Sequence, residues 1–399
     1  MRRYRTAYDG SRVVRKMGRL LLFNCSNDLA LASGTREYIA PKSIAAMEDA
    51  LSALPFWWAE DGDAVLVGSS DEARVCEEFF SSHNKNIFFT SNEEGYNALC
   101  KRTAHTFYPA PWGWSRATAE RYRHFGVPQE LLPGNDRLDD IRTLSSREFA
   151  AGYIAELQRE AHSEGWGEAL AGENMQFVRT LENYCIQERT IFKSPWSSSG
   201  RGIFAADSLD APSIRQKLSG FIKRQGGFIA DRFYDKRIDF ALEYYITPDG
   251  KIDFLGYSFF TAGINGYYGY NTVAPQEELR ASIIADGCSK ELLDRLIATH
   301  KKQLQKSLKG RYTGPIGVDM LSTIENGIYK IHPCLEINLR MNIGILALDI
   351  QRRLPHTGQD TIHLLPAKGK KFSALLSNKK LLIGLKEQIE TIIPNAASL

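Results

Sequence analysis

Two short stretches of the chain combine residue types that bind phosphate groups and divalent metal ions. The first is TIFKSPWSSSGRGIF at residues 190–204, where Lys193 ends an apolar run and precedes a loop of small residues. Small residues let backbone N–H groups approach a phosphate, serine hydroxyls add donors, and lysine adds positive charge. The familiar phosphate loop has its lysine after the last glycine, so that motif is excluded. A serine-glycine turn between two hairpin strands is the alternative interpretation.

The second stretch is YKIHPCLEINLRMNIG at residues 329–344, whose residues alternate in polarity. Odd positions from 331 to 339 are apolar, while the even positions carry His332, Cys334, Glu336, Asn338 and Arg340. A period of two predicts a strand with one polar face. Glu336 and Asn338 offer oxygen ligands to a hard cation, and Arg340 adds a guanidinium one step beyond. His332 precedes a proline and is interpreted as a packed residue rather than a catalytic base.

A further carboxylate is expected on a neighbouring strand. GPIGVDML at residues 314–321 supplies Asp319, and IENG at residues 324–327 is typical of a turn. The turn predicts a hairpin in which Asp319 and Glu336 bridge a pair of cations. Taken alone, Asp319 would more simply belong to a salt bridge on an edge strand.

The N-terminal third predicts a small parallel α/β unit. Strand-like runs at residues 19–24, 63–68 and 86–90 alternate with helix-like segments at residues 41–54 and 70–82. Ligands of such sheets lie beyond the carboxyl ends of the strands, which makes weak substrate candidates of Asn27, Asp28, Ser69 and Ser70. Polar residues at these places more often cap helices. Residues 1–16 are rich in Arg and Lys and are predicted to be a disordered basic arm.

Four other segments carry local predictions. YPAPWGW at residues 108–114 is interpreted as the exit from the α/β unit, and a Ser-x-x-Glu signature from Ser145 to Glu148 predicts a capped helix. Residues 256–271 alternate aromatics with glycines and are interpreted as a substrate-facing or packed loop. The tail at residues 378–393 predicts an amphipathic helix that docks on the second lobe or forms a contact between subunits of a homodimer. The aromatic residues of the loop are Tyr257, Phe260, Tyr267, Tyr268 and Tyr270.

Composition narrows the classes of function. The chain has 399 residues, 43% hydrophobic content and a net charge of +3, which predict two or three domains and give no argument for a nucleic-acid or membrane partner. Its six cysteines form no CxxC pair, so neither a zinc site nor a disulfide framework is indicated. A reducing cytoplasm is the expected location.

The order of these motifs resembles that of the ATP-grasp superfamily of carboxylate-amine and carboxylate-thiol ligases. The resemblance rests on EINLR at residues 336–340 and FKSPWSSSGRGI at residues 192–203, and extends over residues 140–345. It implies an α/β fold with a small parallel domain at residues 17–118, followed by a grasp of two lobes with antiparallel sheets. The first lobe with its lid would span residues 119–228, and the second, with the metal site and C-terminal helix, residues 229–399.

The resemblance also implies residue roles. ATP would be bound by Lys193, the flap residues Ser197, Ser198, Ser199, Gly200, Arg201 and Gly202, and by Asp231, Phe233 and Asp239. Mg²⁺ or Mn²⁺ would be held by Asp319, Glu336 and Asn338. The family usually has a second lysine before the loop, but this chain has none between Lys101 and Lys193, and Arg147 is predicted to replace it.

The implied reaction is ligation through an acylphosphate. ATP phosphorylates a substrate carboxylate, an amine or thiol displaces the phosphate, and Lys193 and Arg340 are the expected catalytic residues. Substrates are expected to be small molecules such as amino acids or a peptide. A kinase acting on a hydroxyl compound and a non-catalytic nucleotide sensor are the two alternatives.

Overall fold

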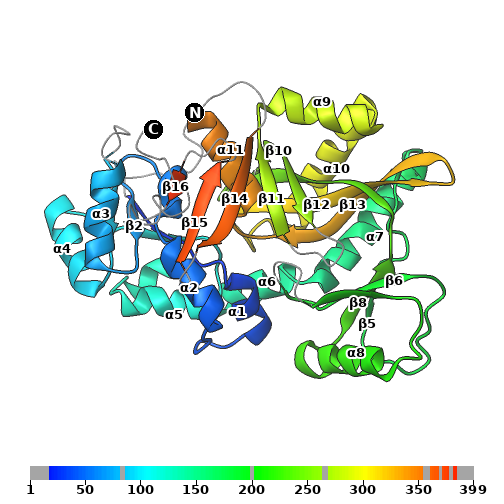
Figure 1. Cartoon of the computed structure of the whole chain (residues 1–399), viewed down its shortest axis with the longest axis horizontal. Helices are drawn as coiled ribbons and strands as arrows, with labels where there is room; N and C mark the ends of the chain where they lie inside the picture. The colour runs from blue at the N-terminus through cyan, green and yellow to red at the C-terminus, as the bar shows by residue number, and fades with distance from the viewer. Residues whose placement is uncertain are drawn as a thin grey trace. The chain divides into compact units, whose positions relative to one another are not determined.

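The computed structural model describes residues 18–80, 86–197, 202–262, 268–353, 360–367, 371–376 and 381–383 (Figure 1). The chain divides into two compact units. The first comprises residues 1–138, 349–355 and 360–399, and the second comprises residues 139–348 and 356–359. The predicted basic arm lies outside the described residues. Strands from residues 360–383 group with the first unit, whereas the sequence interpretation placed them in the second lobe.

A parallel sheet forms the centre of the first unit, as the alternating pattern predicts. Its strand order is β3-β2-β1-β4, and each neighbouring pair is parallel. The interpretation of residues 108–114 as the exit from this unit is wrong, because they begin with β4. Prolines are tolerated in β4 because it is an edge strand. The strands are β1 (Arg19–Leu22), β2 (Ala64–Leu66), β3 (Phe88–Thr90) and β4 (Tyr108–Pro111).

Helices connect these strands, and their apolar faces supply the core of the first unit. Leu20 and Leu22 of β1 pack in one cluster with Tyr96, Phe107 and Tyr122, all of them buried. The helices are α1 (Asn27–Ser33), α2 (Lys42–Ala50), α3 (Ser70–Phe80), α4 (Glu93–Thr103), α5 (Arg116–His124) and α6 (Asn135–Leu144), with short 3₁₀ turns η1 (Leu54–Trp57) and η3 (Gln129–Leu131). Helix α6 contains the boundary between the units.

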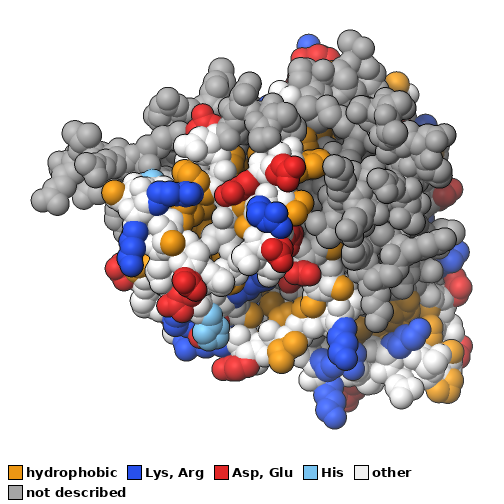
Figure 2. Space-filling model, turned by 60° about the vertical axis from the view of Figure 1, so that its left-hand side comes forward, with side chains coloured by type: hydrophobic (Ala, Val, Ile, Leu, Met, Phe, Trp, Pro, Cys, Tyr) orange, Lys and Arg blue, Asp and Glu red, His pale blue; other side chains and the backbone are white. Residues whose placement is uncertain are grey.

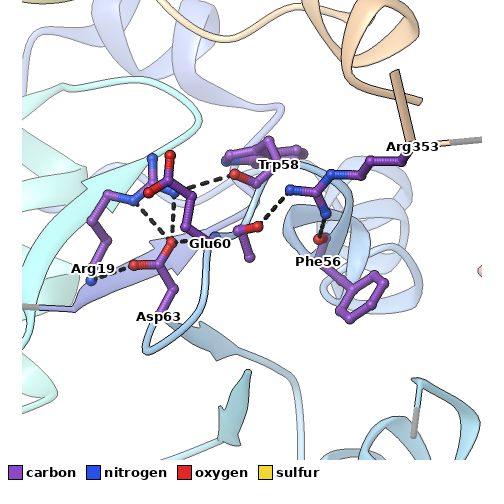
Figure 3. Close-up of polar contacts among 7 residues, drawn as sticks. Arg19, Phe56, Trp58, Glu60, Asp63 and Arg353 are labelled. Carbon is purple, nitrogen blue, oxygen red and sulfur yellow. Dashed lines mark hydrogen bonds and ion pairs between the residues drawn. The ribbon is translucent and has the colours of Figure 1, made fainter. Parts of the chain in front are cut away.

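Two arginines of the first unit, Arg19 and Arg353, bind η1 and the loop that follows it (Figure 3). The Arg19 Nε atom donates to Asp63 Oδ2 at 3.0 Å, and Arg19 Nη2 donates to the Trp58 carbonyl at 3.1 Å. Arg353, at the end of α11 (Ile343–Arg353), donates to the Phe56 carbonyl at 2.7 Å. The Phe56 carbonyl, which also accepts from the Ala59 amide, and the Trp58 carbonyl thus each gain a side-chain donor.

After the end of α6, the second unit continues with α7 (Arg147–Ser163) and a small antiparallel sheet of order β5-β8-β6-β7. Phe192 and Phe228 are fully buried in the core between this sheet and α8. The predicted Ser145 cap is off by one residue, because Ser146 is the N-cap and its hydroxyl accepts from the Phe149 amide. The elements are β5 (Gln176–Val178), β6 (Thr190–Lys193), β7 (Ile203–Ala206), α8 (Pro212–Gln225) and β8 (Phe228–Arg232), with η4 (Gly167–Ala169).

A larger antiparallel sheet completes the second unit, with order β13-β12-β9-β10-β11. The predicted IENG hairpin is confirmed: Asn326 and Gly327 have φ angles of +51° and +77°, and the turn joins β12 to β13. Positive φ at both central residues matches the twist of paired strands. The elements are β9 (Lys236–Ile246), β10 (Ile252–Ala262), β11 (Tyr268–Val273), α9 (Gln276–Asp286), α10 (Lys290–Leu308), β12 (Gly314–Glu325) and β13 (Ile328–Asn338).

Two local interpretations are corrected by these strands. The loop interpretation of residues 256–271 is wrong for residues 256–262, which belong to β10, and for residues 268–271, which belong to β11, whereas residues 263–267, with Tyr267, lie outside the described residues. Gly256 sits at a bulge in the pairing of β10 with β9 and has φ of +151°. The prediction of a tail helix is wrong at residues 381–383, which form β16 (Leu381–Ile383). Strand β16 pairs with β15 (Lys371–Leu376), and β15 pairs with β14 (Asp360–Ala367). The rest of that segment lies outside the described residues.

Candidate active site

Two carboxylates face each other on the polar surface of the large sheet. Asp319 of β12 is directly opposite Glu336 of β13, and the Asn338 amide donates to Asp319 Oδ2 at 3.2 Å. Burial and the negative charges of Glu336 and Glu243 raise the pKa of Asp319 well above its usual range. Like charges directly opposite each other destabilise a sheet, and a bound cation would relieve that repulsion.

The donor set of Asp319, Glu336 and Asn338 suits a hard divalent cation. Its two carboxylates and one amide are the oxygen ligands that Mg²⁺ accepts together with substrate phosphates. Among the described residues no group of three or more His, Cys, Asp or Glu could hold a metal by itself.

Lys193 ends β6 in the small sheet and is buried, with 6% of its surface exposed. Its Nζ lies 3.8 Å from Asp231 Oδ2 on β8. Burial lowers the pKa of Lys193, while the carboxylates of Asp231 and Glu336 oppose that change. Lys193 is therefore within electrostatic range of Glu336 on β13, although 143 positions separate the two residues in the sequence.

Arg147 connects the two groups of residues. Its Nη2 donates to Glu336 Oε2 at 2.7 Å, and its Nη1 donates to the Ser194 carbonyl and to Ser197 Oγ, both at 2.8 Å. The guanidinium is fixed because Arg147 is the first residue of α7 and its amide donates to the Pro195 carbonyl. These contacts place the Arg147 guanidinium beside Lys193's loop and Glu336. That Arg147 replaces the missing lysine stays a prediction.

The loop after Lys193 is held at both ends. Ser194 donates its amide to the Gly202 carbonyl at 2.9 Å, and Gly202 has φ of +70°. The Trp196 Nε1 atom donates to the Arg142 carbonyl. The Arg142 guanidinium carbon lies over the Trp196 ring, 4.2 Å from the ring centre. Ser197 is buried, and the flap candidates Ser198, Ser199, Gly200 and Arg201 lie outside the described residues.

The residues expected to meet the nucleoside lie in two places. Asp231 is buried and its Oδ2 lies 3.1 Å from His332 Nε2; burial opposes its ionisation, but His332 and Lys193 hold the pKa of Asp231 below its usual range. Phe233 follows β8 and lies under the Arg189 guanidinium. Asp239 forms an ion pair with Lys236 on β9, two residues before Ala241, which faces Asp319.

His332 is packed, as its position before Pro333 predicts. It is fully buried, its ring meets that of Tyr234 edge-on at 5.4 Å, and its Nδ1 has no hydrogen-bond partner in the described part of the chain. Gly172, with φ of +88°, lies against it so closely that a Cβ would come within 2.5 Å of Nε2. His332 is therefore held in place to hydrogen-bond to Asp231.

One functional candidate escaped the sequence reasoning. Glu243 in β9 is 1% exposed and occupies the same face of the sheet as Asp319, and burial raises the pKa of Glu243 to about 7. A signal was present, because Glu243 is the single charge in the apolar run FALEYY at residues 240–245. An isolated carboxylate in a buried strand indicates either a site or a structural contact.

The polar residues proposed in the first unit have ordinary structural contacts. The Ser69 hydroxyl accepts from the Glu72 amide at 3.1 Å, in the first turn of α3. Asn27 and Asp28 are buried in the first turn of α1, and Ser70 starts α3. Capping, the alternative considered from the sequence, accounts for Ser69.

The described part of the surface drawn in Figure 2 carries both signs of charge interspersed. This distribution agrees with the net charge of +3. A stretch of helix with the length and hydropathy of a membrane span was not found among the described residues.

Comparisons with known proteins give structural neighbours only. No family model matches the sequence. No curated protein matches it either. A putative ATP-grasp superfamily protein from Archaeoglobus fulgidus is similar at 13% identity, 92% coverage of this chain, 99% of that chain and a TM-score of 0.44.

Two further solved structures are similar at the same level. A biotin carboxylase from Campylobacter jejuni is 11% identical, with a TM-score of 0.48, and the match covers 89% of this chain and 77% of the carboxylase chain. An L-amino acid ligase from Bacillus licheniformis is 14% identical, with a TM-score of 0.41, and the match covers 89% of this chain and 82% of the ligase chain.

Proposed function

We propose that this protein is an ATP-dependent ligase that joins a carboxylate substrate to an amine or thiol through an acylphosphate, releasing ADP and phosphate. The observation that carries the proposal is the meeting of three elements in one unit. Arg147 of α7 bonds both to the loop after Lys193 and to Glu336, which faces Asp319. Cationic and anionic groups from distant parts of the sequence thus surround one place, as phosphoryl transfer requires.

Each group has a role that its chemistry supports. Lys193 and Arg147 bind and orient the phosphates of ATP, and the loop from Ser194 to Gly202 covers them. Asp319, Glu336 and Asn338 would hold Mg²⁺ or Mn²⁺. A bound cation of this kind supplies positive charge that offsets the phosphoryl oxygens during transfer.

Arg340 is assigned to the substrate carboxylate. It follows Asn338 at the end of β13, and its charge acts on both Asp319 and Glu243. A guanidinium can bind a carboxylate through two hydrogen bonds, which would orient the attacking oxygen and stabilise the acyl group as the amine adds. This assignment distinguishes a ligase from a kinase, which has less use for an arginine beside the acceptor.

The experiment is an ADP-release assay with MgATP and pools of amino acids and carboxylic acids, with and without hydroxylamine. Hydroxylamine converts an acylphosphate to a hydroxamate, which is detected by its iron complex. Hydroxamate formation supports the ligase. ADP release without hydroxamate would replace it with a kinase, and stabilisation by MgATP without turnover would replace it with a nucleotide sensor.

A further inference from the structure

Glu243 is a buried carboxylate whose contacts reach the turn that carries Arg340. Its Oε1 accepts from Ser258 Oγ of β10 at 2.7 Å, and its Oε2 accepts from Asn342 Nδ2 at 2.8 Å. Among the described residues, no Lys or Arg forms an ion pair with it. Two neutral donors thus hold a carboxyl group that is 1% exposed, and ionisation of a group so placed costs stability.

Asn342 links Glu243 to the first turn of α11. Its Oδ1 accepts from the Ile345 amide at 2.7 Å, and its carbonyl accepts from the Leu346 amide at 3.1 Å. The side chain therefore caps the helix with its oxygen while its nitrogen binds Glu243. Because Asn342 follows Arg340 by two residues, the same contact fixes the turn between β13 and α11.

Two glycines allow this turn to approach the sheet. A Cβ at Gly317 would lie 2.2 Å from Asn342 Nδ2 and 2.8 Å from Glu243 Oε2. A Cβ at Gly344 would lie 2.2 Å from Glu243 Oε1. Gly317 is paired with Glu243 on one side and with Asn338 on the other, so the contact is built next to the proposed metal ligands.

Arg340 also responds to this carboxylate through charge. Its guanidinium favours the ionised form of Glu243 and opposes the effect of burial on that pKa. The electrostatic attraction acts on the Arg340 guanidinium, whereas the hydrogen bond to Asn342 restrains the backbone of the turn that carries Arg340. Both hold Arg340 on the face of the sheet that carries Asp319.

We infer that Glu243 is a positioning residue for Arg340: through Asn342 it fixes the turn so that the guanidinium meets the substrate carboxylate. This inference rests on the proposed function. It predicts that Glu243 affects the carboxylate substrate much more than the nucleotide, whose proposed contacts come from Lys193, Arg147 and a metal ion on β12 and β13. The cluster of Glu243, Ser258 and Asn342 thus sets the geometry of the acid subsite without touching ATP.

The test compares Glu243→Gln and Asn342→Ala with wild type, using the best acid from the ADP-release pools. Each substitution should raise KM for that acid by about 10- to 100-fold, because displacement of an orienting group by about 1 Å costs up to about 100-fold. KM for ATP should change less than about twofold. The double variant should be no worse than the single ones, because both break one link.

A matched control is Glu325→Gln at the end of β12. The Glu325 carboxylate is also partly buried and accepts from Arg232 Nη1 at 2.7 Å, but it lies six residues along the strand from Asp319. Both KM values should be unchanged in this variant. An equal rise in KM for the acid in Glu325→Gln would overturn the inference, as would normal KM for the acid in Glu243→Gln.

Amide hydrogen exchange over residues 338–346 supplies a readout that needs no substrate. Glu243→Gln should accelerate exchange in this turn, and Glu325→Gln should not. If wild type releases no ADP with any acid, the proposed function fails, and unchanged exchange in Glu243→Gln would then also overturn the inference. Faster exchange with normal KM for the acid would reduce Glu243 to a purely structural contact and contradict the positioning role.

Discussion

The ion pair between Arg147 and Glu336 gives the sharpest prediction about the site, because it joins α7 to the proposed metal strand. We expect Arg147→Met to destabilise the ligand-free protein. The guanidinium is 3% exposed and makes hydrogen bonds to the Ser194 carbonyl, Ser197 Oγ and Glu336 Oε2. Methionine fills a similar volume but leaves all three acceptors without this donor.

The size of the effect follows from the burial of both partners. Removing one member of a fully buried pair costs about 3–5 kcal/mol. The Glu336 side chain is 22% exposed, so water can solvate its carboxylate in part, and we expect a total loss of about 3 kcal/mol. The coupling between the two side chains should be about 1.5 kcal/mol, the range of a hydrogen bond to a charged group.

The assay is a double-mutant cycle by urea unfolding without nucleotide or divalent metal, with Arg147→Met, Glu336→Gln and the double variant. The control cycle uses Arg179→Met and Glu148→Gln, a pair whose side chains are 65% and 44% exposed and whose coupling should not exceed about 0.5 kcal/mol. Equal coupling in the two cycles would show that the site pair is no more than a surface contact. The reasoning about Arg147 as the link between the loop and β13 would then be refuted.

Three other predictions follow from the same geometry. Glu336→Gln should abolish Mg²⁺-dependent ADP release while circular dichroism stays native, and retained turnover would remove Glu336 from the metal site. The pKa of Glu243 is raised from its usual 4.5 to about 7, so the native state keeps a proton that the unfolded chain releases. The free energy of unfolding of wild type should therefore fall by about 3 kcal/mol relative to Glu243→Gln as pH rises from 4.5 through 7, and a difference independent of pH would contradict this. Gly344→Ala should cost about 1–3 kcal/mol through contact with Glu243, whereas Gly152→Ala, with no atom within 4 Å in mid-helix α7, should stabilise by up to about 1 kcal/mol; equal effects in thermal unfolding would contradict the close approach.

Local patterns in the sequence predicted the parts of the site that depend on neighbouring residues. The alternation at residues 331–340 predicted a polar strand face, and IENG predicted the hairpin that places Asp319 opposite Glu336. Both succeed because side chains alternate along strands and because tight turns have strong residue preferences. The parallel sheet of the first unit followed from the same kind of pattern.

Features that depend on tertiary contacts were not predicted. The pairing of β10 with β11 was missed because its register shifts between Phe260 and Ala262, and the sequence shows no regular period of two across that irregularity. The role of Glu243 depends on Asn342, 99 residues away, and no local rule joins them. Whether Arg147 would meet Glu336 likewise depended on how α7 packs against β13.

The central claim is that Lys193 and Glu336 bind one nucleotide with its metal ion. Isothermal titration calorimetry with a non-hydrolysable ATP analogue and Mg²⁺ tests it most directly, in wild type, Lys193→Met, Glu336→Gln and the control Lys251→Met, an exposed lysine paired with Asp253. We predict saturable binding to wild type and to Lys251→Met, and at least about tenfold weaker binding, or about 1.4 kcal/mol, to each of the other two. Equal affinity in all four proteins, or no binding to wild type, would contradict the account.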